Sequence, residues 1–145
     1  MKPSLARRLI DTALQASRHA VAPYSNFPVG AAVLTVSGKL YTGVNVESAS
    51  FGLTCCAERV ALFKALSEGE RDFVAIAVVA PDTKGPMPCG ACRQLLAEFA
   101  PRAIVFSADS RKPNKWQRFT VAKLLPRAFL FTPSLAKKSI PDYVE

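Results

Sequence analysis

Three cysteines and one glutamate have the residue types and spacing that could do chemistry in this chain. Cys56 is followed two residues later by Glu58, and Pro88 leads into Cys89 and, three residues further, Cys92. Three thiolates can hold a zinc ion while its fourth coordination position stays open, and a carboxylate beside that position can move protons. The pattern therefore favours an open zinc site with a catalytic use.

Other interpretations of the cysteines remain open at this point. Cys89 and Cys92 have the C-x-x-C spacing of redox motifs, although a thioredoxin-like interpretation gives the earlier cysteine and the glutamate no role. A closed structural zinc site needs a fourth ligand, and the candidates, Cys55 and the only histidine, His19, stand at no usual ligand spacing. We interpret Cys55 as a small buried hydrophobic residue and His19 as a partly exposed helix residue.

Both cysteine groups are expected at helix starts. We expect Thr54 to cap a helix over residues 55–67, which Gly69 ends, and a second helix to cover residues 89–99. Unpaired amide groups and the helix dipole favour negative charge at such positions, which lowers thiol pKa values and supplies the thiolates that zinc requires. The two cysteines of the second helix share one face, because they are three positions apart.

The rest of the chain predicts a sheet between helical layers. Hydrophobic periodicity predicts a first helix over residues 5–18 and strands over residues 29–36, 40–46, 73–80 and 103–106. The first two strands form a hairpin, and strands that alternate with helices imply a partly parallel sheet. Residues 107–118 receive no assignment, and residues 133–145 are expected to form a loosely held tail.

The composition bounds the class of protein. A chain of 145 residues that is 50% hydrophobic suits a single domain over residues 1–145, which buries roughly 70% of its unfolded surface. The first twenty residues mix charges with apolar residues and do not resemble a secretion signal, and no apolar run is long enough to cross a bilayer. All four cysteines lie in two short segments, which favours a cytoplasmic protein over a disulfide-linked one.

The formal net charge of +8 raises the question of a nucleic-acid partner. Arg111, Lys112, Lys115 and Arg118 surround Trp116, but no RNA-binding or helix-turn-helix signature accompanies them. We therefore interpret this stretch as a solvated basic face in preference to a site for a phosphate-bearing partner, and we do not expect nucleic acid to be the substrate.

On its motifs the chain resembles the small, homo-oligomeric cytidine deaminases of pyrimidine salvage. The sequence C-A-E-R at residues 56–59 and P-C-G-A-C-R-Q at 88–94 carry the resemblance together, and it extends to residues 22–30, 43–49 and 120–129. It selects Cys56 over Cys55, because Glu58 then follows the ligand at the two-residue offset of zinc deaminases. It implies an α/β fold, a three-layer α/β/α sandwich with a mixed five-stranded sheet.

The resemblance also implies an activity. One zinc ion per subunit would be held by the three cysteines, and Glu58 would carry protons during hydrolytic deamination of cytidine and deoxycytidine to the uracil nucleoside and ammonia. Arg59 would hydrogen-bond ligand sulfurs, with help from Arg93. The expected small-molecule partner is thus a cytosine nucleoside.

Further residues receive roles by the same resemblance. The implied substrate contacts are Asn45 and Glu47 at the ribose hydroxyls, Phe27 beside the base, the backbone of Ala57 and Pro88 at the pyrimidine edge, and Phe129 from a neighbouring subunit. Because Phe129 would complete a neighbour's pocket, a homotetramer is expected, with an isologous dimer as the fallback.

Several departures from the family pattern keep rival functions open. Ser48 stands where a second asparagine is frequent, Phe51 stands where a tyrosine is frequent, and residues 107–119 are longer and more basic than expected. Rivals on the same machinery are deamination of a cytosine nucleoside antibiotic such as blasticidin S and hydrolysis of an N4-modified cytidine. A polynucleotide-editing deaminase and a non-catalytic zinc-binding module are less favoured, since the compact chain has little room for strand-guiding loops.

Overall fold

The structure, a computed structural model, describes residues 3–131, so the expected tail at 133–145 lies outside the described residues. Its centre is a five-stranded sheet in the order β2-β1-β3-β4-β5. The strands are β1 Gly30–Thr35, β2 Leu40–Val44, β3 Phe73–Ala80, β4 Ile104–Asp109 and β5 Trp116–Thr120. β3 and β4 are parallel and the other neighbours are antiparallel, which confirms the mixed sheet.

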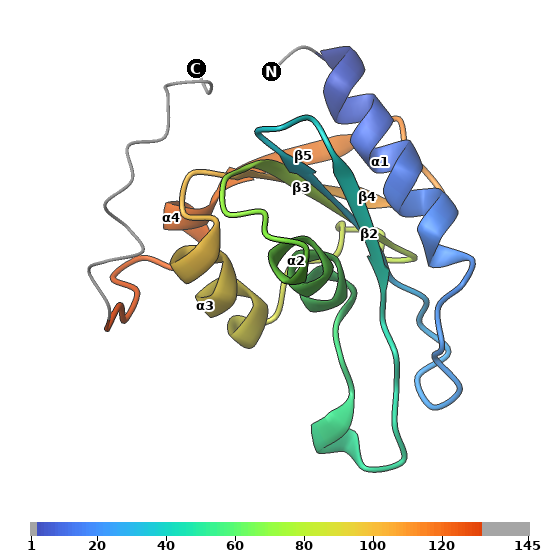
Figure 1. Cartoon of the computed structure of the whole chain (residues 1–145). Coiled ribbons are helices and arrows are strands. Elements are labelled where there is room, and N and C mark those ends of the chain that lie inside the picture. The colour runs from blue at the N-terminus through green and yellow to red at the C-terminus, as the bar shows by residue number, and fades with distance from the viewer. Residues whose placement is uncertain (1–2, 132–145) are drawn as a thin grey trace.

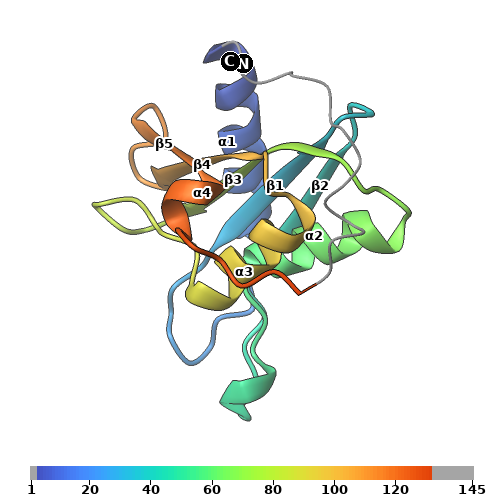
Figure 2. The same ribbon diagram turned by 90° about the vertical axis from the view of Figure 1, so that its left-hand side faces the viewer.

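Helices cover both faces of the sheet. Helix α1, Pro3–Ser17, lies on one face, and α2 Ala57–Ser67, α3 Gly90–Phe99 and α4 Val121–Leu124 lie on the other (Figure 1). Figure 2 shows the second group on the near face, with α1 behind the sheet. Two apolar cores result, one under the amphipathic stripe of α1 and one under α2 and α3. This arrangement confirms the predicted three-layer sandwich.

The most buried strands explain why the sheet forms where it does. β3 reads F-V-A-I-A-V-V-A and is buried along almost its whole length, as expected for a strand with helices on both faces. The bounds of β3 match the predicted strand. Gly43 of β2 permits the close approach of α2, because a Cβ atom there would collide with the carbonyl oxygen of Ala57. The hairpin thereby holds the first turn of α2 close to the sheet.

One local prediction was wrong, and a segment that received no assignment holds part of a strand. Thr54 does not cap α2; it ends the short 3-10 turn η1, Phe51–Leu53, and the extended residue Cys56 takes the N-cap position instead. The unassigned segment after β4 contains β5, which pairs antiparallel with β4. That strand is short, polar and on the edge of the sheet, so it lacks the continuous apolar signal of a central strand.

Among the described helices, none has the length and apolar character needed to span a membrane.

Candidate zinc centre and active site

The starts of α2 and α3 bring three cysteine sulfurs together. Cys56 is the N-cap of α2, Cys89 is the N-cap of α3, and Cys92 lies in the first turn of α3. The Sγ atoms of Cys56 and Cys89 are 3.7 Å apart, those of Cys89 and Cys92 are 3.4 Å apart, and all three lie within 4.8 Å of one another. Cys92 is buried, Cys56 is half-buried and Cys89 is exposed.

These sulfurs fit a tetrahedral zinc ion. Zn–S bonds of about 2.3 Å at tetrahedral angles place two ligand sulfurs roughly 3.8 Å apart, close to the two separations above. Among residues 3–131, these three thiols are the only group of three or more potential metal ligands that lie close enough together to hold one ion. Cys55 is instead tied by its backbone to Val46, with which it exchanges two hydrogen bonds of 2.9 Å. The cluster therefore offers zinc three protein ligands and leaves one coordination position without one.

The surroundings of the sulfurs favour negative charge. The Arg59 guanidinium donates one hydrogen bond of 3.3 Å to Cys56 Sγ and another of 3.3 Å to the carbonyl of Thr54. Hydrogen bonds, first from Cys92 and then from Arg59 and Cys89, lower the pKa of the Cys56 thiol to about 5. The pKa of Cys92 is raised in turn, because its thiol is the partner that donates to Cys56 and is also buried. The predicted contact of Arg59 with a ligand sulfur is present.

Glu58 lies in the first turn of α2, two residues after the cluster cysteine Cys56. Only 5% of it is exposed. Burial, and secondarily the negative charge of Cys56, raises the pKa of this carboxyl to about 7. A carboxyl with a pKa near the working pH both accepts and releases protons efficiently, which is the property of a general acid and base. Glu58 thus has the environment that proton transfer requires.

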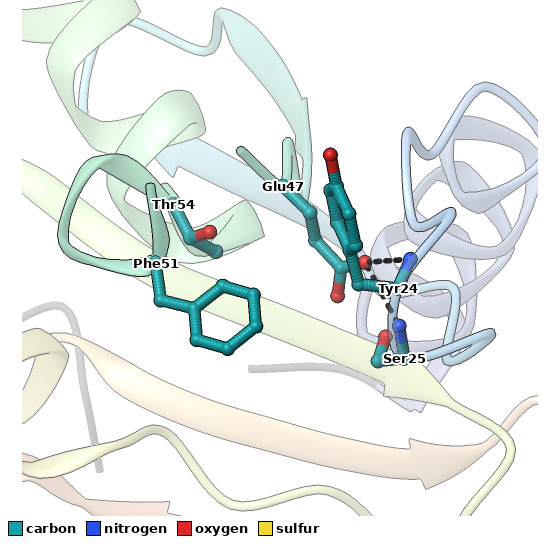
Figure 3. A pocket seen from close by; sticks show the side chains of 5 residues that line it. All are labelled: Tyr24, Ser25, Glu47, Phe51 and Thr54. Carbon is teal, nitrogen blue, oxygen red and sulfur yellow. Dashed lines mark hydrogen bonds between the residues drawn. The ribbon is translucent and has the colours of Figure 1, made fainter. Parts of the chain in front are cut away.

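A pocket of about 330 Å³ lies beside β2, between the segment that precedes β1 and η1 (Figure 3). Its lining residues are Tyr24, Ser25, Glu47, Phe51 and Thr54. One oxygen of Glu47, Oε1, accepts hydrogen bonds of 3.0 Å from the backbone N–H groups of Tyr24 and Ser25. Hydrogen bonds from Ser25 and Tyr24 lower the pKa of Glu47. Glu47 is therefore an anion held in place at the pocket wall.

Asn45 connects this pocket wall to Phe27. Its Oδ1 accepts a hydrogen bond of 2.9 Å from the N–H of Val29, and its Nδ2 donates one of 2.9 Å to the carbonyl of Phe27. Asn45 is 8% exposed, and Phe27 is half-buried. The buried amide thus fixes the course of the segment that carries Phe27.

The structure uses Arg93 differently from what was expected. Its Nε donates to the carbonyl of Pro88 at 2.7 Å and its Nη1 to the carbonyl of Leu124 at 2.9 Å. Arg93 therefore ties the loop before α3 to the end of α4, whereas the sequence led us to expect that it assists at a ligand sulfur.

Phe129 is 73% exposed, and its carbonyl accepts a hydrogen bond of 2.7 Å from Gln94.

Sequence reasoning missed four of the five pocket residues: Tyr24, Ser25, Phe51 and Thr54. Tyr24 and Ser25 fall within a segment already noted for its resemblance, but their contribution depends on the backbone N–H groups, which a side-chain motif does not reveal. Thr54 was assigned to a helix cap, while its hydroxyl in fact accepts the N–H of Ser48 at 3.1 Å. The polarity of the Y-S-N turn before β1 was the available signal.

An open sulfur site at two helix starts, with a buried carboxyl next to it, defines a zinc-dependent hydrolase. The family model for the cytidine and deoxycytidylate deaminase zinc-binding region matches residues 3–108, and the chain belongs to this family. The chain is 55% identical over 122 residues to the cytidine deaminase of Halalkalibacterium halodurans. The aligned region covers 83% of this chain and 91% of the relative.

Two further comparisons place the chain within the family. The crystal structure of cytidine deaminase from Burkholderia pseudomallei superposes with a TM-score of 0.82 at 45% identity, covering 89% of this chain and 100% of that one. The blasticidin-S deaminase of Bacillus cereus is 31% identical over 106 residues, 68% of this chain and 74% of the relative. These findings confirm the predicted family, the α/β fold and the zinc cofactor.

Proposed function

We propose that this protein deaminates cytidine and deoxycytidine hydrolytically, releasing ammonia and the uracil nucleoside, with Glu58 as its proton carrier. The observation that carries the proposal is the buried carboxyl of Glu58 beside the three-sulfur cluster. Zinc, when held by Cys56, Cys89 and Cys92, would supply a Lewis acid that makes water nucleophilic at neutral pH. The polypeptide must then move protons and orient the nucleoside.

Glu58 performs the proton transfers in this proposal. The carboxylate takes a proton from the attacking water and delivers it to N3 of the cytosine ring, and it then carries a proton to the departing amine. Its raised pKa suits both directions of transfer. The backbone of Ala57 and Pro88 is proposed to hold the pyrimidine edge, since these residues adjoin the cysteines of α2 and α3.

Arg59 supports the site from outside the reacting atoms. Three thiolates around Zn²⁺ would give the metal centre a formal net charge of minus one, which would weaken the pull of the ion on water. The hydrogen bond from Arg59 to Cys56 withdraws negative charge from one sulfur and so partly restores that pull. Arg93 is proposed to position the Pro88 loop through its carbonyl contact.

Glu47 and Asn45 are proposed to select the sugar. The Oε1 atom of Glu47 is held by two backbone N–H groups, which orients its second oxygen toward a ribose hydroxyl. Asn45 keeps Phe27 in place as the wall beside the base. A fixed carboxylate that accepts hydrogen bonds suits an ordinary ribose and gives a reason to prefer a plain nucleoside over blasticidin S.

The apolar exposure around the pocket supports a homotetramer, with an isologous dimer as the fallback. Phe51 and Leu53 are each 75% exposed and lie on η1, which projects from the body of the molecule in Figures 1 and 2. Phe129 and Phe131, 73% and 84% exposed, stack with ring centroids 6.4 Å apart. Exposed aromatic clusters of this kind mark interaction sites. Phe129 is proposed to enter a neighbouring subunit's pocket.

Two further proposals concern the chain as a whole. The described elements share one sheet and two cores, which supports a single catalytic domain over residues 1–145. Four free cysteines suit the cytoplasm, where thiols are kept reduced.

A substrate panel tests the proposed activity. Zinc-loaded protein is offered cytidine, deoxycytidine, blasticidin S, an N4-acyl cytidine and a cytosine-containing single-stranded oligonucleotide, and ammonia or carboxylic acid release is followed. We expect kcat/KM for cytidine to exceed those for blasticidin S, the N4-acyl nucleoside and the oligonucleotide by at least tenfold. Faster turnover of any of these three, or no turnover of cytidine, contradicts the proposal.

A further inference from the structure

A second pocket of about 330 Å³ lies at the carboxyl ends of β3 and β4. It is lined by residues 83–85 after β3, 107–109 at the end of β4, and Lys112, Lys115, Trp116 and Gln117 before and within β5. It shares no lining residue with the pocket in Figure 3. β3 and β4 are the parallel pair of the sheet, and ligands of α/β sheets commonly bind beyond the carboxyl ends of such strands.

The charge of this second pocket is positive. Lys84, Lys112 and Lys115 line it, and all three are exposed. The acidic residue among the lining, Asp109, is 7% exposed and is paired with Arg111 through an Nε–Oδ1 contact of 3.0 Å. The carboxylate of Asp109 is thus already neutralised by a cation, which leaves the charge of the lysines to attract an anion.

The floor of the second pocket is rigid. Ser107 is 1% exposed, and its hydroxyl donates a hydrogen bond of 2.6 Å to the carbonyl of Pro86. Gly85 has φ of +80° and packs so closely on Ser107 that a Cβ atom at Gly85 would lie 2.8 Å from the serine Oγ. A preformed site loses less entropy on binding than a mobile one.

Hydrogen-bonded turns also hold the lysine backbones. The N–H of Lys84 donates to the Asp82 carboxylate at 2.9 Å, and the N–H of Lys112 donates to the Asp109 carbonyl at 2.9 Å. The N–H of Lys115 in turn donates to the carbonyl of Lys112 at 3.0 Å. The three ammonium groups therefore extend from fixed points around one cavity.

Trp116 lines the second pocket beside the lysines and also packs against the apolar core under α1. It begins β5, where it pairs with Ala108, and it is half-buried. A nucleobase stacks favourably on an aromatic ring, at roughly 1–3 kcal/mol per base. Lysines beside an indole ring thus offer complementary surfaces to the phosphate and the base of one nucleotide.

We propose that this second pocket binds a mononucleotide, with its phosphate among Lys84, Lys112 and Lys115 and its base against Trp116. The site is separate from the nucleoside pocket and goes beyond the proposed deamination, because a nucleoside has no phosphate to place there. A mononucleotide fits better than a nucleic-acid strand, because the lining is a cavity built from three short segments and a strand requires an extended groove.

The sole tryptophan of the chain, Trp116, reports directly on this site. Zinc-loaded protein is first saturated with uridine, which occupies the nucleoside pocket as the product, and is then titrated with uridine 5′-monophosphate while tryptophan fluorescence is recorded. We expect saturable quenching that weakens with added salt. Inorganic phosphate alone should bind at least tenfold more weakly, and further uridine should produce no quenching.

Matched variants locate the binding. Lys112→Gln combined with Lys115→Gln should weaken uridine monophosphate binding by roughly tenfold or more, because two charge-assisted contacts are lost. Lys123→Gln, which alters an exposed lysine of α4, should leave the affinity unchanged. Trp116→Leu, measured by calorimetry, should weaken the nucleotide and not inorganic phosphate. Circular dichroism and thermal unfolding of each variant confirm that it is folded.

Several results would overturn the assignment. Unchanged nucleotide affinity in the double lysine variant would place the binding elsewhere, and equal affinity for inorganic phosphate would remove the role of the base. Tight binding of a single-stranded oligonucleotide with no binding of the mononucleotide would identify the surface as a strand-binding one. Because the titration measures binding and not turnover, its outcome does not depend on whether the deamination proposal succeeds.

Discussion

Glu58 and Glu47 show how backbone position gives one residue type two different properties. Glu58 follows the N-cap of α2 and is buried, and this burial raises its pKa to about 7. Glu47 accepts hydrogen bonds from an exposed turn, which lower its pKa. The first is suited to transferring protons, and the second is suited to remaining an anion that receives hydrogen bonds.

Replacing Glu58 tests the proton-transfer role at constant shape. Glu58→Gln should retain one zinc ion per subunit and an unchanged fold, while kcat for cytidine falls by roughly three orders of magnitude, because the amide cannot carry protons. Zinc content, circular dichroism and ammonia release measure these three properties. Glu98→Gln, on the exposed side of α3, is the matched control and should keep full activity. A Glu58→Gln enzyme with near-normal kcat would exclude the residue from the mechanism.

Adjacent cysteines provide a test of the ligand assignment. Cys89→Ser removes a sulfur of the cluster, so the purified protein should hold far less zinc and unfold at a temperature several degrees lower, since bound metal stabilises the folded state. Cys55→Ser should keep its zinc and nearly its full stability, because Cys55 lies outside the cluster. Metal analysis and thermal unfolding of both variants show which cysteine is a zinc ligand. The reverse ranking would show that the wrong cysteines were chosen.

At the residue scale the sequence predicted the sulfur site well and the hydrogen-bond partners poorly. The spacing of Cys56, Cys89 and Cys92 is a strong signal, because zinc constrains both the residue type and its distance along a helix. The partners of Arg93 carry no such signal. Its guanidinium reaches the carbonyl of Leu124, thirty-one residues away, and only the folded chain brings those atoms together.

At the scale of elements, burial decides which strands and helices the sequence reveals. β3 was predicted with its observed bounds, since a strand covered on both faces is apolar throughout. β5 was missed because its residues W-Q-R-F-T are all half-buried or exposed and mix charge with aromatic rings. The start of α2 was placed two residues early, because Thr54 has the side chain of a good cap but belongs to the end of η1.

Glu47 links the end of β2 to the turn at Tyr24 and Ser25, and this link should depend on pH. Its pKa lies below the usual 4.5 in the folded state, so the carboxylate stabilises the fold fully above that pH and loses the effect as the pH falls through the lower value. Glu47→Gln should therefore unfold at a lower temperature than the unmodified protein near neutrality, and the gap between the two unfolding temperatures should close as the pH falls through the lowered pKa of Glu47. Thermal unfolding of both proteins across this range measures the gap.

Acid also releases zinc, but the loss affects both proteins alike and cancels in the difference. A gap that stays constant from neutral to acidic pH would show that the Glu47 carboxylate does not hold the turn.

For the whole molecule, the apolar residues left at the surface are as informative as those inside. Phe51, Leu53, Phe129 and Phe131 each expose more than two thirds of their surface, although both cores are closed around the sheet. The pocket in Figure 3 opens next to Phe51. A monomer would therefore leave both an apolar surface and the mouth of its pocket in water.

Phe129 tests whether subunits complete one another's sites. Phe129→Ala should raise KM for cytidine several-fold with a smaller change in kcat, because the ring contributes binding surface and no proton transfer. Sedimentation of the unmodified protein should show a tetramer. Leu130→Ala, at a neighbouring residue that is 54% exposed, provides a control for general loss of apolar surface. An unchanged KM would leave Phe129 without a part in substrate binding.

The placement of β1 between β2 and β3 has a consequence for maturation of the enzyme. The segment with Cys56 follows β2 and the segment with Cys89 follows β3, and both strands are aligned by backbone hydrogen bonds to β1 that involve no sulfur. We therefore expect ion uptake to follow assembly of the sheet. Protein stripped by a chelator should keep its strand content and regain the ion on simple addition, without passing through the unfolded chain.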